Sequence, residues 1–158
     1  METTNTLAWM QVAEIELIYK SKVKASERPK VTTSYDAFKL FKQTWDENKI
    51  EFIEQFKVLF LNRGNKVLGI FELSTGGVTG TVADPKLVFT AALKINACNI
   101  ILCHNHPSGS LKPSQADEAL TQKIKEAGRY LDLPVIDHLI ISGEDSYYSF
   151  ADEGLFNV

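Results

Sequence analysis

The sequence is poor in cysteine, in positive charge and in long apolar runs, and each shortage excludes a class of protein. Its 158 residues include two cysteines, and 17 basic against 20 acidic side chains give a formal net charge of −3. Cys98 and Cys103 are too few and too close together for a disulfide framework, so we expect reduced thiols. A slightly acidic chain also has no global positive field that would attract nucleic acid or an anionic membrane.

Signals for export or membrane insertion are also missing from the sequence. Its apolar runs are far shorter than the roughly 20 residues that a membrane-spanning helix needs. The first residues, Met1–Asn5, lack the basic and apolar regions of a signal peptide. We therefore expect a cytoplasmic protein without a membrane partner.

Hydrophobic residues at 44% and charged residues at 23% are the proportions of a globular protein. Residues 1–32 are predicted to form an N-terminal strand (Val12–Tyr19) and a charged loop, and residues 33–158 to form the domain. The expected elements of the domain are helices that start at residues 34, 84 and 114, strands at 51–62, 66–73, 97–103, 134–142 and 146–150, a loop at 75–83 and a last helical turn at 151–156. The inner stripe of the third helix is expected to be Ala119, Leu120, Ile124 and Ala127. Strands and helices mixed in this way predict an α/β (α+β) sandwich.

Two of the three histidines lie one residue apart, directly after the apolar run Asn99–Leu102. Residues two apart on a strand point to the same face, so His104 and His106 are expected to project side by side where the strand ends. That end is where α/β sheets usually place their ligands. Asp117 follows Ser114 by three positions, so both lie in the first turn of the next helix. Two histidines and an aspartate form a three-ligand set that leaves a fourth zinc position open for water.

Each of these features alone also has a purely structural interpretation. A His-x-His pair often means only that polar residues end a strand, and the helix dipole favours an acidic residue in a first turn. The Ser114 hydroxyl either caps the helix or faces the site. The complete spacing, His-x-His, seven residues, serine, two residues and aspartate, is what favours a metal site.

This spacing, His104-x-His106-x7-Ser114-x2-Asp117, matches the signature of the JAMM (JAB/MPN) metalloproteases at each of its four positions. The residues around it resemble one branch of these proteins, the RadC-like family. The segments that carry the resemblance are 54–62, 97–109 and 133–138, and the similarity covers roughly residues 33–152.

The resemblance implies an MPN/JAB (cytidine-deaminase-like) architecture, in which helices sandwich a mixed β-sheet. It also implies that His104, His106 and Asp117 bind one zinc ion per chain. The activity implied is that of a zinc-dependent peptidase or isopeptidase-like hydrolase that acts on a peptide or protein through a metal-bound water.

A JAMM site needs an upstream glutamate as general acid/base. Glu54 is the best match to the family pattern, because it lies at the start of the strand before an apolar run, while Glu51 and Glu72 are alternatives. By the same resemblance, Glu54 would take a proton from water and pass it to the leaving amine. Ser114 would donate a hydrogen bond to the oxyanion.

Two further residues near the motif, His138 and Cys103, are not among the expected ligands. His138, in the run Ile136–Leu139, is typical of RadC-like proteins. It fits a hydrogen-bonding partner of a metal ligand, a member of a binding groove, or a histidine satisfied within a strand. Cys103 should face the opposite side of its strand from His104 and therefore belongs to the core.

Full-length RadC-like proteins carry an N-terminal helix-hairpin-helix region associated with DNA. About thirty residues precede the domain here, and we expect them to hold no such region, so nucleic acid is a partner only by family association. One alternative function is a DNA-repair-associated or protein-binding module with a structural or vestigial metal. Another is a nucleotide or nucleic-acid hydrolase or deaminase, against which the missing Cys-x-x-Cys pair argues.

Overall fold

The computed structural model describes residues 13, 16, 19–76 and 83–156, and the strands among them form one sheet. Five strands lie in the order β2-β1-β3-β4-β5. Their bounds are Gln55–Leu61 for β1, Val67–Thr75 for β2, Asn99–Asn105 for β3, Val135–Ile141 for β4 and Tyr147–Ser149 for β5. β3 and β4 run parallel and all other neighbours run antiparallel, so the sheet is mixed, as predicted.

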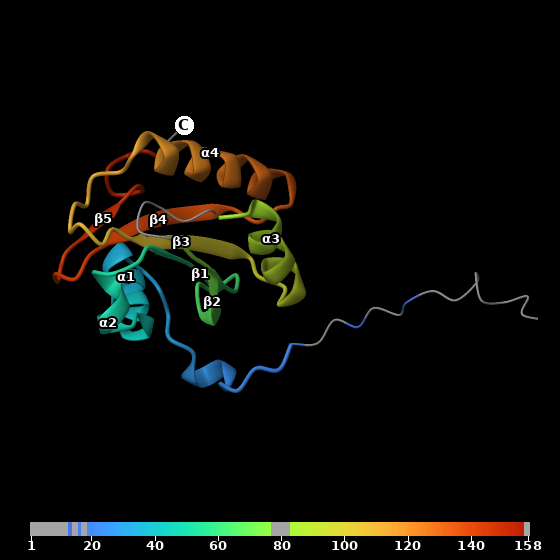
Figure 1. Ribbon diagram of the computed structural model, residues 1–158. Helices are drawn as coiled ribbons and strands as arrows, with labels where there is room; N and C mark the ends of the chain where they lie inside the picture. Colours follow the sequence, from blue (N-terminus) through green and yellow to red (C-terminus); the bar gives the residue numbers. More distant parts are fainter. Residues whose placement is uncertain (1–12, 14–15, 17–18, 77–82, 157–158) are drawn as a thin grey trace, which may run out of the picture.

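Helices cover both faces of this sheet (Figure 1). Helices α3 (Pro85–Lys94) and α4 (Gln115–Tyr130) pack on one face, while α1 (Ser34–Thr44) and the short α2 (Glu47–Ile50) pack on the other. A 3-10 helix, Ala25–Glu27, precedes them in the loop that was predicted to be charged. The predicted α+β sandwich is therefore confirmed. Within the described part of the chain, no helix is long and apolar enough to cross a membrane.

Alternation along β3 divides the hydrophobic core between the two faces of the sheet. Ile100 and Leu102 belong to the cluster under α3 and α4, whereas Ile101 and Cys103 belong to the cluster under α1. All four side chains are buried, because the strand is covered on both faces. Cys103 is a core residue, as predicted, and burial raises the pKa of its thiol well above the usual value.

Side-chain caps explain why the helices begin where the sequence predicts. Thr33 accepts a hydrogen bond from the backbone N–H of Asp36, whose carboxylate accepts one from the backbone of Thr33 in return. Asp84 caps α3, and Pro85 occupies its first turn. The aromatic stripe of α1 is buried, as expected of a core helix. It consists of Phe38, Phe41 and Trp45.

The start of β1 differs from the prediction. The strand was expected from Glu51, but β1 begins at Gln55, and residues 51–53 form a turn that follows α2. Asp46 caps α2, and the backbone N–H groups of residues 52 and 53 both bond to the carbonyl of Lys49, which keeps this segment out of the sheet. Glu54 consequently lies directly before the strand.

Smaller differences concern α4 and the end of the chain. Ala119 was expected on the inner stripe of α4 but is exposed, and Thr121 is buried instead. Residues 151–156 form turns and not the predicted helical turn. The predicted strand Val12–Tyr19 and the predicted loop 75–83 lie largely outside the described residues.

Candidate metal centre

His104 and His106 lie side by side at the end of β3. The backbone N–H of His106 donates to the carbonyl of Ile141 at 2.9 Å, which continues the pairing with β4 beyond the last residue of the strand. Both rings therefore point to the same face, and their Nε2 atoms are 3.0 Å apart. His104 is buried and His106 is partly exposed, so the pair lies where the buried strand reaches the surface.

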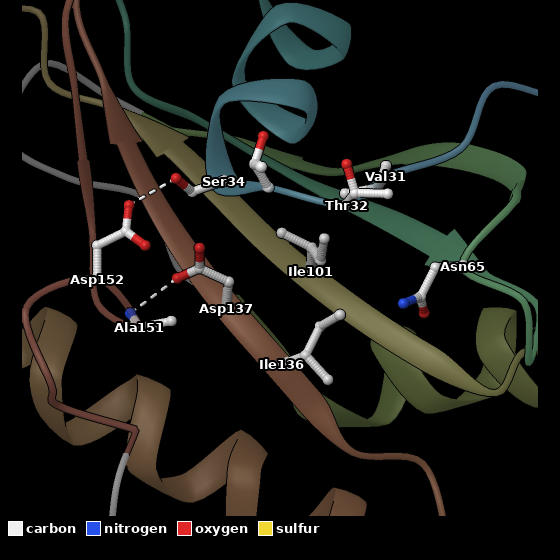
Figure 2. A pocket seen from close by; sticks show the side chains of 10 residues that line it. Val31, Thr32, Ser34, Asn65, Ile101, Ile136, Asp137, Ala151 and Asp152 are labelled. Atoms are coloured by element: carbon white, nitrogen blue, oxygen red, sulfur yellow. Dashed lines mark hydrogen bonds between the residues drawn. The ribbon is translucent and has the colours of Figure 1, made fainter.

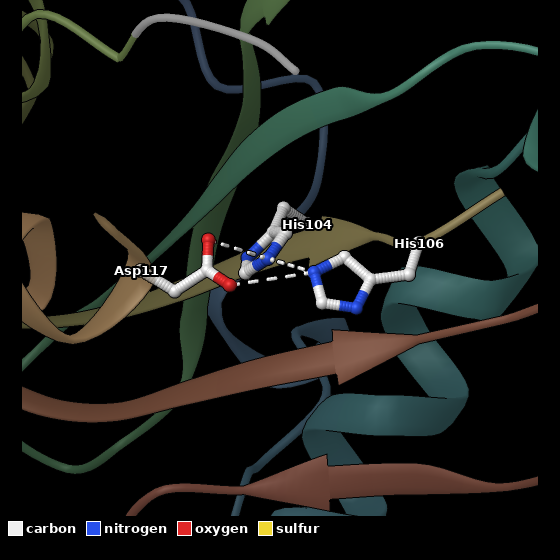
Figure 3. A group of neighbouring side chains, drawn as sticks. All are labelled: His104, His106 and Asp117. Carbon is white, nitrogen blue, oxygen red and sulfur yellow. Dashed lines mark hydrogen bonds and ion pairs between the residues drawn. The ribbon is translucent and has the colours of Figure 1, made fainter. Parts of the chain in front are cut away.

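Asp117 reaches the two rings from the first turn of α4. Ser114 caps this helix: its Oγ accepts from the backbone N–H of Asp117 at 3.1 Å, and its own N–H donates to Asp117 Oδ2 at 2.7 Å. The capping box fixes the Asp117 carboxylate so that Oδ1 lies 3.2 Å from His104 Nε2 and Oδ2 lies 3.4 Å from His106 Nε2 (Figure 3). One ligand atom from each of the three residues lies within 4.8 Å of the others, a grouping that could hold a metal ion.

The loop between β3 and α4 sets the orientation of the His106 ring. Gly109 adopts a φ of 85°, a left-handed conformation that favours glycine, and its N–H donates to the His106 carbonyl at 3.0 Å. The turn brings the carbonyl of Ser110 to 2.7 Å from His106 Nδ1. A carbonyl oxygen only accepts, so Nδ1 carries the hydrogen and Nε2 presents its lone pair to the site.

A second protein contact occupies the other nitrogen of His104. Its Nδ1 lies 2.8 Å from Nε2 of His138, and its ring stacks on Phe56 at 5.9 Å between centroids. Only Nε2 of His104 therefore faces Asp117 and His106. His138 itself is fully buried, so its assignment to a substrate groove is wrong, and its place behind a candidate ligand is the one that the geometry supports.

The donor atoms at this point of the structure fit a cation. Imidazole lone pairs and a carboxylate repel one another unless a proton or a metal ion lies between them. Burial raises the pKa of Asp117, but the two neighbouring imidazoles lower it by more, so its carboxylate is ionised. The carboxylate of Asp117 is in turn the main reason why the pKa of His106 is raised. Nitrogen and oxygen ligands of this kind are those that zinc takes in proteins.

Strand register separates the three candidate glutamates. Phe56 pairs with His104 at the end of the antiparallel β1–β3 ladder, and Glu54 comes two residues earlier, directly before the strand. The charge of Glu54 also contributes to the raised pKa of His106. Glu54 is partly buried, and its carbonyl accepts from Gly76 N at 2.9 Å, which joins it to the end of β2.

The two alternative glutamates lie elsewhere. The carboxylate of Glu72 accepts hydrogen bonds from Gln55 Nε2 at 2.6 Å and from Thr75 Oγ1 at 2.7 Å. Gln55 is the neighbour of Phe56 on β1, so its side chain points to the face opposite the histidines. The carboxylate of Glu51 lies against Gly143, beside a cavity that Lys42 also lines. Of the three, Glu54 is the one whose charge acts on His106.

Asn105, which sequence reasoning missed, connects the histidine motif to the segment before β1. Its Oδ1 accepts from Gln55 N at 2.7 Å, and its Nδ2 donates to the carbonyls of Ile50 at 2.7 Å and Ile53 at 2.9 Å. These bonds hold the chain on both sides of Glu54. Asn105 is fully buried, and its position between the two histidines was the only available sequence signal.

The comparisons with known proteins agree with this geometry. A family model described as "RadC-like JAB domain" matches residues 31–155. A UPF0758 protein of Flavobacterium johnsoniae is 52% identical over 127 residues, which make up 80% of this chain and 54% of the relative. A UPF0758 protein of Chlorobaculum parvum is 35% identical over 148 residues, 92% of this chain and 64% of the relative.

UPF0758 protein YfjY of Escherichia coli K12 is 43% identical over 102 residues, 65% of this chain and 63% of the relative. The chain spans about half the length of the first curated relatives that it matches. The family match covers most of the chain and includes all three candidate ligands. The chain belongs to the RadC-like JAB domain family.

Proposed function

We propose that this protein is a zinc-dependent metallohydrolase that cleaves peptide or isopeptide bonds in a peptide or protein substrate. The observation that carries the proposal is the convergence of His104 Nε2, His106 Nε2 and the Asp117 carboxylate, with the charge of Glu54 close enough to contribute to the raised pKa of His106. Both cysteines are free thiols, which favours the cytoplasm as its location.

Zinc is the metal we propose for this donor set. Two imidazole nitrogens and one carboxylate are typical of catalytic zinc sites, which keep one further position for water or substrate. A zinc ion held there would supply a Lewis acid that polarises the scissile carbonyl and acidifies a water molecule. The capping box of α4 and the Ser110 carbonyl hold two of the three ligands in place.

Glu54 is proposed to move the proton. Its carboxylate takes one proton from the attacking water as the oxygen bonds to the carbonyl carbon. The same proton then passes to the leaving nitrogen as the carbon–nitrogen bond breaks, so the products are a carboxylic acid and an amine. General acid–base catalysis of this kind contributes about 10²–10⁴-fold to the rate.

Ser114 is proposed to stabilise the oxyanion. Its Oγ accepts from the N–H of Asp117, which leaves the single hydroxyl hydrogen to donate elsewhere. Ser114 is exposed beside the ligand Asp117, where a substrate carbonyl oxygen can approach it. Loss of one such donor costs about 3–4 kcal/mol of transition-state stabilisation in other enzymes.

The test is hydrolysis of a panel of peptides and isopeptide-linked peptides by zinc-loaded protein, with products identified by mass spectrometry. Glu54→Gln should lower kcat by about 10²–10⁴-fold. Glu72→Gln is the matched control, because that carboxylate binds Gln55 and Thr75 on the other face and should leave kcat unchanged. Zinc-loaded wild type that cuts no member of the panel would overturn the proposal and favour a binding module.

A further inference from the structure

His138 is fully buried and has a protein partner at each ring nitrogen, although it is not one of the three candidate ligands. Its Nε2 lies 2.8 Å from Nδ1 of His104, and its Nδ1 lies 2.6 Å from Oγ1 of Thr121. The ring packs between Phe56, at 5.4 Å, and Phe150, at 4.9 Å between centroids. The imidazole is therefore held in one place, and the direction of its two hydrogen bonds decides what it does.

The Thr121 hydroxyl sets that direction. Its Oγ1 lies 2.6 Å from the backbone carbonyl of Asp117, one helical turn earlier in α4. A carbonyl oxygen can only accept, so the single hydroxyl hydrogen of Thr121 points to Asp117. Oγ1 then has only lone pairs for His138, and the hydrogen between them belongs to Nδ1 of His138.

The position of the hydrogen on His138 decides the tautomer of His104. A neutral imidazole carries a single hydrogen, and the Thr121 hydroxyl places that of His138 on Nδ1. Its Nε2 must then accept, which requires the hydrogen on Nδ1 of His104. The remaining nitrogen of His104, Nε2, is left with a free lone pair that faces Asp117 and His106.

We propose that Thr121 and His138 form a buried hydrogen-bond relay that fixes His104 in the tautomer and orientation that bind a metal ion. The inference rests on the metal site of the proposed function and adds two positioning residues to it. The relay also links two ligands through protein atoms, because it starts at the backbone of Asp117 and ends at the ring of His104. A metal-binding histidine usually gives its other N–H to a carboxylate, a carbonyl or water, and here a second histidine takes that place.

The first test measures the affinity for Zn²⁺, and for Co²⁺ with its visible absorption bands, by competition with a chelator. His138→Phe keeps an aromatic ring between Phe56 and Phe150 but removes the acceptor, and should weaken zinc binding about 10–100-fold. Thr121→Val, which lacks the hydroxyl, should bind zinc several-fold more weakly than wild type. Thr121→Ser, which keeps the hydroxyl, should bind zinc as wild type does. If His138→Phe does not fold, the comparison of Thr121→Val with Thr121→Ser still tests the relay.

The controls remove similar hydrogen bonds without touching the relay. Thr90→Val deletes the same hydroxyl-to-carbonyl bond within α3, and Ser149→Ala deletes a buried hydroxyl bond on the other face of the sheet. Both should bind zinc as wild type does. Unchanged affinity in Thr121→Val, or equal losses in Thr121→Val and Thr90→Val, would overturn the relay.

A second test does not depend on metal or on activity. In metal-free protein with ¹⁵N-labelled histidine, the NMR couplings of the imidazole nitrogens report which one carries hydrogen. Hydrogen on Nδ1 of His138 supports the relay, and hydrogen on Nε2 overturns it. Wild type that binds neither zinc nor cobalt would instead defeat the proposed function, so the two failures are distinguishable.

Discussion

Two polar clusters lie back to back in this sheet, and they differ in whether donors match acceptors. They meet at β4, where the neighbours Asp137 and His138 point to opposite faces. On the α1 face, Asp137 Oδ1 accepts from Ala151 N at 3.0 Å (Figure 2) and from His138 N at 2.7 Å. Its Oδ2 accepts from Ser149 Oγ at 2.7 Å. This carboxylate lies beside a cavity of about 370 Å³, and protein donors serve both of its oxygens.

On the α4 face, acceptors outnumber donors. His104 Nε2, His106 Nε2 and the Asp117 carboxylate converge as acceptors, because the other nitrogen of each ring is already used by the protein. Polar groups that are shielded from water are normally paired, so a cluster of acceptors without a matching donor could hold a cation. The first cluster is complete as protein, whereas we propose that a metal ion completes the second.

The largest expected effect is that of a chelator on the free energy of unfolding, which should depend on the cluster of the α4 face and not on that of the α1 face. Removal of zinc from wild type should lower the free energy of unfolding by about 4 kcal/mol when free zinc had been about 1,000 times Kd. Ser149→Ala, on the α1 face, should respond in the same way, and His106→Ala should not respond. Thermal unfolding with and without chelator measures this. A wild type that is insensitive to chelator would remove the distinction between the faces.

The next effect concerns Asn105, which belongs to the histidine motif but binds the chain on the α1 side. Asn105→Ala should release the segment around Glu54 and lower kcat by up to about 100-fold, since a misplaced catalytic group costs that much. Zinc affinity should stay near the wild-type value. Asn99→Ala, which removes a side-chain bond at the other end of β3, is the control. Loss of zinc together with activity would contradict the assignment of Asn105 to Glu54.

A smaller effect is expected from Ser149→Ala. The substitution leaves Asp137 Oδ2 without its donor and should lower the free energy of unfolding by about 1–3 kcal/mol, as measured by urea denaturation. Zinc affinity should not change, because no hydrogen bond joins Ser149 to the ligands. Weaker zinc binding in this variant would mean that the two clusters are coupled through β4.

The smallest expected effect is a pH dependence that arises on the α1 face. Burial raises the pKa of Asp137 above its usual value of 3.8, so the folded protein holds this proton more tightly than the unfolded chain does. The stability that the proton provides is complete below about pH 4 and is lost as pH rises through the folded pKa. Asp137→Asn has no such proton.

Urea denaturation across this pH range can detect the effect. The stability of wild type minus that of Asp137→Asn should decrease as pH rises from about 4. Contributions from Asp117 and other acids are common to both proteins and cancel in the difference. A difference that grows with pH would show that the pKa of Asp137 is lowered in the fold.

The sequence predicted the parts of the site that depend on local periodicity. The strand period puts His104 and His106 on one face, and the helix cap places Asp117 beside Ser114. Glu54 could be ranked above its alternatives only through family resemblance, because its distance from the histidines depends on how β1 pairs with β3.

Contacts between distant parts of the chain were not predictable. Thr121 looked like an ordinary helical residue, and its role depends on His138, seventeen positions later in the chain and on another element. Asn105 likewise acts on residues fifty positions away. The false start of β1 at Glu51 has the same origin, since a short helix and the Asn105 side chain hold that turn outside the sheet.

The most direct test of the account is a zinc titration of the metal-free protein followed by a crystallographic map at the zinc absorption edge. We expect about one zinc ion per chain, bound by His104, His106 and Asp117 in the arrangement typical of zinc sites. In His106→Ala the fold should persist and the zinc should be lost. Folded wild type that takes up no zinc, or zinc bound away from these three side chains, would contradict it.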